Sequence, residues 1–205
     1  YNEKIIEVLT TKDGLPSNSI NHLALDNFGN IWGVTNNGLF SIIGSEITNY
    51  KNRFSFEQVN YQRLNIGKSG VVWMQGNGIL SSFDGKKVNN YFRNDSISID
   101  GGGSGLLALD DGNVLIGGSG LKILYPNEDK GVLKKISDSG WINGITYTID
   151  RKIVYSDAEE GIIILENLKK DTLFNEQNGF IFDEPTTVFV DKKGWIWSAH
   201  QSGGV

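Results

Sequence analysis

Cysteine is absent from this 205-residue chain. Its absence excludes disulfide bonds, thiolate metal sites and a cysteine nucleophile, and it leaves the redox compartment open. The two histidines, His22 and His200, are too few to build a zinc site without cysteine or a helix-borne pair of ligands. The glycine run at 101–105 lacks the Lys-Ser/Thr ending of a phosphate-binding loop. We therefore expect no metal ion and no cofactor.

Long apolar runs and excess positive charge are also missing. No stretch approaches the roughly 20 apolar residues that span a bilayer. The net charge is −5, and Lys169-Lys170 is a short basic cluster that stands beside acidic residues, so nucleic acid is not an expected partner. No secretory signal opens the chain, and a start at Tyr1 without Met indicates that a leader or an upstream domain was removed.

Proline is scarce and glycine is abundant, with 3 and 26 residues respectively. With 39% hydrophobic residues, this composition suits many short strands joined by tight turns. No window of ten residues shows the 3.6-residue apolar spacing of an amphipathic helix. The chain is predicted to be all-β.

One stretch, residues 26–39, recurs along the chain. Asp, Asn and Gly supply its turns, and residues 31–35 have the β-branched and aromatic composition of a strand,. Aligned copies are 41, 42, 39 and 43 residues apart when one strand position is taken from each: Trp32, Trp73, Leu115, Val154 and Trp197. A period near forty with several strands per repeat predicts a β-propeller made of four-stranded antiparallel blades.

We predict a single propeller segment over residues 1–205. Its five repeats of about 41 residues give blades at approximately 11–51, 56–92, 104–136, 143–174 and 185–205. Residues 1–10 are interpreted as the outer strand of a preceding blade. The chain stops at residues 203–205, where the fifth blade should begin its third strand, so we expect a fragment of a larger propeller.

The motif residues carry a family resemblance. The Gly-Leu-Pro-Ser-Asn loop at 14–18, the Asp-x-x-Gly-Asn-Ile-Trp turn and strand at 26–32, and Thr-Asn-Asn-Gly-Leu at 35–39 resemble the two-component regulator propeller repeat. Residues 13–40 match closely and residues 191–197 match in part, while the other repeats keep mainly the glycine and strand positions.

The resemblance implies a propeller that is commonly seven-bladed and lies on the extracytoplasmic side of a hybrid sensor histidine kinase. Such sensors in gut Bacteroidetes recognise oligosaccharides. It therefore implies a periplasmic domain, tethered to the inner membrane by segments outside this chain, that binds an oligosaccharide or another small ligand and controls transcription. A homodimer would form through the parent receptor.

Propeller geometry selects one rim as the candidate binding face. The starts of the inner strands and the ends of the second strands meet there, and the rim is rich in short polar and amide side chains that suit sugar hydroxyl groups. The predicted ligand-binding residues are Asn18, Asn36, Gln75, Asn77, Trp141, Asp157, Glu159, His200 and Gln201. The structural alternative for each of them is a solvated turn.

Other aromatic and ionisable residues are assigned structural roles. The second-strand tryptophans at 32, 73, 195 and 197 are expected to pack between sheets, and His22 is expected among inner-strand side chains rather than facing the central channel. No catalytic residue is assigned. Two alternatives stay open: a protein-interaction scaffold, and a propeller lyase or glycosidase that uses Asp157 and Glu159 as paired carboxylates.

Overall fold

The structure is a computed structural model that describes residues 8–51, 53–54, 60–76, 78–92, 105–127, 131–138, 140–180 and 184–201. Within these ranges it contains 19 β-strands and two short 3-10 helices, η1 (Thr11–Asp13) and η2 (Glu176–Asn178). The prediction of an all-β chain is confirmed. Among the described residues, no helix has the length and apolar character needed to cross a membrane.

The first two sheets are antiparallel and meander from one strand to the next in chain order. Short turns rich in Gly, Asn and Asp join the strands, as expected for hairpin connections. The first sheet consists of β1 (Ile20–Leu25), β2 (Ile31–Thr35), β3 (Gly38–Ile43) and β4 (Glu46–Asn49). The second consists of β5 (Arg63–Ile66), β6 (Val72–Gly76), β7 (Ile79–Phe83) and β8 (Val88–Phe92).

The third and fourth sheets keep this plan with one addition. The third sheet contains β9 (Leu106–Ala108), β10 (Val114–Ile116), β12 (Lys122–Tyr125) and β13 (Val132–Lys135). The fourth contains β14 (Trp141–Tyr147), β15 (Ile153–Asp157), β16 (Gly161–Glu166) and β17 (Lys169–Phe174). The short strand β11 (Gly118–Ser119) leaves the third repeat and pairs with β14 of the next sheet, which ties the two blades together.

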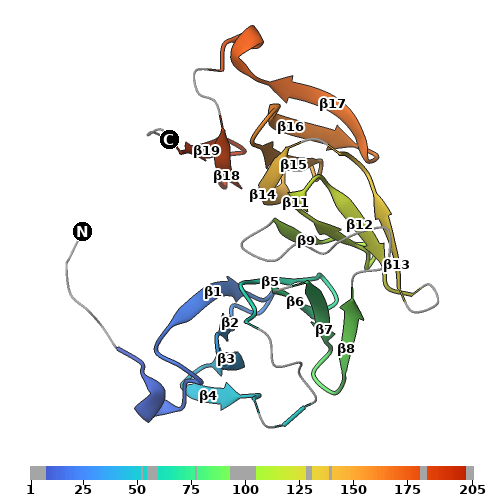
Figure 1. The fold of residues 1–205 in the computed structure, drawn as a ribbon. Helices are drawn as coiled ribbons and strands as arrows, with labels where there is room; N and C mark the ends of the chain where they lie inside the picture. Colours follow the sequence, from blue (N-terminus) through green and yellow to red (C-terminus); the bar gives the residue numbers. More distant parts are fainter. Residues whose placement is uncertain are drawn as a thin grey trace.

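The fifth sheet has two described strands, β18 (Pro185–Val190) and β19 (Ile196–His200). The innermost strands β1, β5, β9, β14 and β18 are neighbours in that order. The sheets therefore follow one another around a common axis, and Figure 1 shows them along an arc. This is the arrangement of consecutive propeller blades.

Apolar side chains fill each space between consecutive sheets. Leu39 of the first sheet clusters with Met74 of the second, and Trp73 from the other face of the second sheet clusters with Val114 of the third. The same pattern continues between the third and fourth sheets and between the fourth and fifth. Because both faces of the internal sheets are covered, the second strands β6, β10 and β15 are buried at every residue.

The tryptophans divide into two groups. Trp73 is buried between sheets, and Trp32 stacks on Tyr50 with 5.6 Å between ring centroids. Trp195 and Trp197 are 60% and 42% exposed, so the prediction of core positions for them was wrong. Their side chains lie on the face of the fifth sheet that points away from the fourth, and they contact each other at 6.1 Å between ring centroids.

The start of the chain also differs from expectation where it can be compared. Residues 1–7 of the predicted outer strand lie outside the described ranges, and residues 8–10 form no strand. Thr10 instead caps η1, with its side chain accepting a hydrogen bond from the backbone N–H of Lys12.

Candidate functional site

A single aspartate organises the turn between β1 and β2. Asp26 Oδ1 accepts hydrogen bonds from the backbone N–H groups of Phe28 and Asn30, each at 2.9 Å. Its Oδ2 accepts from the side chain of Asn30 at 2.9 Å and from Trp32 Nε1 at 3.2 Å. The recurring spacing of aspartate and tryptophan therefore builds a turn and holds the indole in place. Both oxygens of this carboxylate are used by hydrogen bonds within the fold.

The fifth repeat has the same turn. Asp191 Oδ1 accepts from the backbone N–H groups of Lys193 at 2.8 Å and Trp195 at 3.0 Å, and Oδ2 accepts from Trp197 Nε1 at 3.1 Å. The hydrogen bond from the Trp197 indole, supported by these backbone amides, lowers the pKa of Asp191, because hydrogen bonds donated to a carboxylate favour its charged form.

The candidate rim is predicted to combine the starts of inner strands with the ends of second strands, and the strand register places these two parts side by side. The inner strand β14 begins where the second strand β15 ends, with Ile142 opposite Asp157. In the fifth sheet Pro185, at the start of β18, lies opposite His200, at the end of β19. Starts of inner strands and ends of second strands thus share one edge of each sheet.

Trp141 is the aromatic side chain at the start of β14, 40% exposed. Its Nε1 donates to Asn143 Oδ1 at 3.0 Å, and its carbonyl accepts from the backbone N–H of Ala158 at 3.2 Å. Trp141 therefore stands beside the β15–β16 turn, which carries the exposed Glu159. A partly exposed ring next to a carboxylate can stack on a sugar while the acid accepts from its hydroxyl groups.

Asp157 occupies the same region but is completely buried, with 0% of its surface exposed. Its Oδ1 accepts from the backbone N–H groups of Glu159 at 2.9 Å and Glu160 at 3.1 Å. Gly140 packs directly against this carboxylate, where any Cβ would collide with it. The geometry gives Asp157 a turn-forming role. Because its carboxylate is buried, the structure does not support Asp157 and Glu159 as a catalytic pair acting on one substrate.

The candidate amides of the first two blades have structural partners. Asn18 Oδ1 accepts from the backbone N–H of Thr11 at 2.8 Å, and Asn36 Oδ1 accepts from Asn21 Nδ2 at 2.9 Å. Gln75 is buried on β6. Asn77 lies outside the described residues. Asn18, Asn36 and Gln75 lie at or next to the starts of inner strands or the ends of second strands, and none of these three lines the two cavities described below.

The fifth blade contributes the last two candidates. His200 ends β19, is partly buried and packs against Phe180 with 5.3 Å between ring centroids. Gln201 follows it and is exposed. Both residues lie at the edge where Thr186 Oγ1 donates to the carbonyl of Ala199 at 3.0 Å.

A cavity of about 500 Å³ opens at this rim beside Glu159. The β15–β16 turn, the end of β17, the segment around η2 and the residue before β18 form its wall. The lining residues are Ala158, Glu159, Glu160, Gly161, Leu173, Asn175, Glu176, Gln177 and Glu184. Glu160 is paired with Lys170. Sequence reasoning missed the contribution of η2, because only folding brings this connection against the preceding blade.

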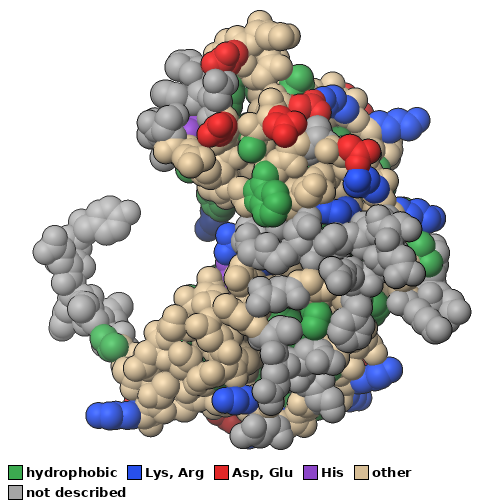
Figure 2. Space-filling model, in the orientation of Figure 1, with side chains coloured by type: hydrophobic (Ala, Val, Ile, Leu, Met, Phe, Trp, Pro, Cys, Tyr) green, Lys and Arg blue, Asp and Glu red, His purple; other side chains and the backbone are tan. Residues whose placement is uncertain are grey.

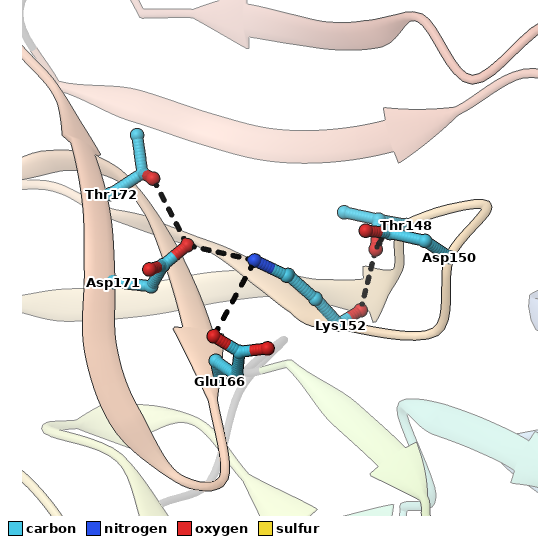
Figure 3. A network of polar contacts seen from close by, with 6 residues as sticks. All are labelled: Thr148, Asp150, Lys152, Glu166, Asp171 and Thr172. Carbon is cyan, nitrogen blue, oxygen red and sulfur yellow. Dashed lines mark hydrogen bonds and ion pairs between the residues drawn. The ribbon is translucent and has the colours of Figure 1, made fainter.

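The opposite rim of the fourth blade carries a surface ion-pair network, shown in Figure 3. Lys152 Nζ lies 3.0 Å from Asp171 Oδ2 and 3.7 Å from Glu166 Oε2. Thr172 Oγ1 donates to Asp171 Oδ2 at 3.2 Å, and the hydrogen bond from Lys152, the larger cause, lowers the pKa of Asp171. The acidic and basic groups satisfy one another here, so this rim offers no unpaired charge for a ligand among these residues.

A second cavity, of about 350 Å³, lies on the axis. Residues from all five inner-strand segments line it: His22, Arg63, Leu64, Asn65, Gly105, Leu106, Asn143, Gly144, Ile145, Thr146, Thr186, Thr187 and Val188. His22 therefore faces the central channel, contrary to the expectation that it would sit among strand side chains. Figure 2 shows the molecule hollowed on the open side of the arc, with basic and histidine side chains along the edge.

The comparisons with known proteins agree with this geometry. Residues 14–37 match the family described as two component regulator propeller. These residues have the pattern of one two-component regulator propeller repeat. The matched residues are the loop before β1, the Asp26 turn and the whole of β2, which are the residues that carried the resemblance in the sequence. A search of the curated proteins found no similar sequence.

Solved structures with the same fold come from proteins of different kinds. The extracellular domain of a protein described as a hybrid two-component system of B. thetaiotaomicron superposes with a TM-score of 0.70 at 18% identity, over 90% of this chain and 26% of that one. Virginiamycin B lyase from Staphylococcus aureus gives 0.67 at 15% identity, over 91% and 65% of the two chains. A gluconolactonase from Xanthomonas campestris gives 0.64 at 9% identity, over 88% and 69%.

These likenesses show the propeller fold. At such low identity they assign no activity, since one fold carries many functions. The chain spans about a quarter of the length of the two-component extracellular domain, 26%, so that protein's role comes to this chain only as a proposal.

Proposed function

We propose that this chain is part of the extracytoplasmic, ligand-sensing propeller of a hybrid two-component sensor, and that its ligand is an oligosaccharide. The observation that carries the proposal is the match of residues 14–37 to the regulator propeller repeat. The similarity of the arc to a two-component extracellular domain over 90% of this chain supports it. In the parent protein, a tether to the inner membrane and a kinase would lie in further segments.

The rim around Trp141 is the part of this propeller that best suits a sugar. Glu159 and Gln177 line the larger cavity, and the partly exposed Trp141 stands beside the turn that carries Glu159. Stacking on the ring and hydrogen bonds to hydroxyl groups are the two contacts that a carbohydrate needs. The cavity volume of about 500 Å³ lies in the usual range for small-molecule sites.

Signalling would follow from the position of this cavity between blades. Its wall combines the fourth blade with Glu184, just before β18 of the fifth. A ligand that contacts both blades can favour one relative arrangement over another, and only such a difference in affinity between states can drive a switch. A homodimer of the parent receptor would carry this change towards the kinase.

A thermal-shift screen of the chain against a panel of oligosaccharides tests the proposal. A ligand that binds only the folded state at 100 times its Kd stabilises it by about 2.7 kcal/mol and raises Tm. We expect a shift with one glycan class that Trp141→Ala reduces. Trp195→Ala is the matched control, because Trp195 is an exposed tryptophan at the opposite end of its strand pair.

Two outcomes would count against a sugar sensor. A flat response from folded protein across the panel would favour a protein-interaction scaffold, for which the exposed aromatic face of the fifth sheet is the supporting observation. Turnover of a glycan by the chain, abolished by Asp157→Asn without loss of folding, would favour an enzyme, as the lyase and gluconolactonase folds illustrate.

A further inference from the structure

The axial cavity holds two basic side chains, and no acidic side chain is among the described residues that line it. His22 from β1 and Arg63 from β5 face the same space. Because the sensor role is itself proposed, the inference drawn from this cavity depends on it for the nature of the ligand. We propose that the axial cavity is an anion site that takes a carboxylate or sulfate group carried by an acidic oligosaccharide.

The two basic side chains are incompletely satisfied inside the protein. Among described residues, His22 Nδ1 is buried without a hydrogen-bond partner. Arg63 Nη1 donates to the carbonyl of Gln62 at 3.3 Å, and the described ion pairs do not include Arg63. A guanidinium has five N–H donors in a fork that matches a carboxylate or a sulfate. The remaining donors of Arg63 are therefore available to an incoming oxyanion.

Electrostatics inside the cavity favour the same occupant. Burial, followed by the charge of Arg63, lowers the pKa of His22. Burial also lowers the pKa of Arg63. Burial thus disfavours the positively charged form of each side chain. An anion bound between them would favour the charged form of both and raise their pKa values.

The neutral side chains of the wall add donors rather than acceptors. Asn65 Oδ1 already accepts from the backbone N–H of Ala108 at 2.9 Å, and Asn143 Oδ1 accepts from Trp141 Nε1 at 3.0 Å. Both amides therefore retain their Nδ2 donors for a ligand. Thr146 and Thr187, which also line the cavity, can donate as well. A wall rich in donors selects an acceptor-rich group, which an oxyanion is and a metal ion is not.

Asn143 also links this cavity to the rim. It lines the axial space and accepts the hydrogen bond of Trp141, the aromatic residue proposed to stack on a sugar. One acidic oligosaccharide could then place its charged group on the axis and a sugar ring at the rim. All five inner-strand segments contribute to the axial wall, so an anion held there is enclosed by residues from every blade of the arc.

The imidazole resonances of the chain provide the test, because its two histidines give one reporter and one internal reference. The chain is titrated by NMR with sodium sulfate against sodium chloride at equal ionic strength, and with glucuronate against glucose. We expect sulfate and glucuronate to shift the resonances of His22 and raise its pKa, while those of His200 stay in place. Anion affinity should increase as the pH falls through the pKa of His22, with His22 and Arg63 as the titratable groups of the described wall.

Variants make the result specific. Arg63→Gln should weaken anion binding by about tenfold, the usual scale of one hydrogen bond to a charged group, and Arg63→Lys should retain part of it. Arg151→Gln is the matched control, since Arg151 is an exposed arginine already paired with Asp110. Equal responses to glucose and glucuronate, or unchanged binding in a folded Arg63→Gln protein, would overturn the anion site.

The outcome separates this inference from the function on which it rests. Neutral oligosaccharides that bind through Trp141 while sulfate and glucuronate leave His22 unmoved would support the sensor and refute the anion site. Sulfate and glucuronate that bind at His22 while no oligosaccharide raises Tm would support the anion site and refute the sugar sensor.

Discussion

Asp26 shows how a motif residue can mark a fold without serving a ligand. Its two carboxylate oxygens accept four hydrogen bonds from its own turn and from the indole of Trp32. Asp111 occupies the corresponding turn of the third repeat with less to hold. It accepts from the backbone and side chain of Asn113, and Leu115 stands in the place of the tryptophan. Leu109, not Asp111, aligns with Asp26 in this turn, so Asp111 is a turn aspartate at a different position that holds no indole.

Replacing Asp26 with alanine should lower the free energy of unfolding by about 2 kcal/mol, since buried or partly buried donors lose a charged acceptor. Asp111→Ala should cost less, because it strands no indole N–H. Urea denaturation followed by far-UV circular dichroism measures both values. Equal losses of stability in the two variants would contradict the larger structural role assigned to Asp26.

At the scale of the element, the sequence predicts strands and turns well and side-chain roles poorly. The repeat period and the turn residues are local signals, so the all-β propeller prediction is confirmed. The burial of Asp157 depends on Gly140, which approaches it from the preceding segment. The place of Arg63 on the axis depends on how five strands converge. Neither relation leaves a pattern in a single repeat, and β11 is too short at two residues to show a period.

The inner strands β14 and β18 approach each other closely at Gly144. A Cβ added to Gly144 of β14 would lie 2.5 Å from the backbone nitrogen of Val188 in β18. Backbone cannot move aside as a flexible side chain can, so Gly144→Ala should push the fourth and fifth sheets apart and cost about 1–3 kcal/mol. Hydrogen exchange should show faster exchange at β18 in particular.

Gly67→Ala is the control for that substitution. Its nearest contact would be the Cβ of Ala108, at 3.4 Å, followed by Ser69 Oγ and the carbonyl oxygen of Val71, each at 3.7 Å, which are ordinary contacts for a packed interior. Both glycines lie where consecutive sheets meet. Equal destabilisation by the two substitutions would mean that the Gly144 contact does not limit how closely the blades approach.

At the scale of the whole molecule, described residues cover both faces of the internal sheets and one face of each of the two end sheets. Ala24 of β1 packs towards the second sheet, while Leu23 and Leu25 alternate with it and are exposed. At the other end of the arc, Phe189 pairs with Trp197 on the uncovered face of the fifth sheet. Burying such apolar area is favourable at about 25 cal/mol per Å², and exposed apolar patches of this kind mark association surfaces.

These faces predict that the 205-residue chain associates with a second copy of itself in a concentration-dependent manner. Sedimentation velocity across a range of concentrations measures this, and Leu23→Lys combined with Phe189→Lys should shift the distribution to monomer. Phe28→Lys is the control, because Phe28 is 88% exposed at the β1–β2 turn rather than on a sheet face. A chain that stays monomeric at every concentration would show that exposure of the end sheets to water costs too little free energy to drive association. If Phe28→Lys shifted the distribution to monomer as much as the double variant does, the contact would lie at the turns instead.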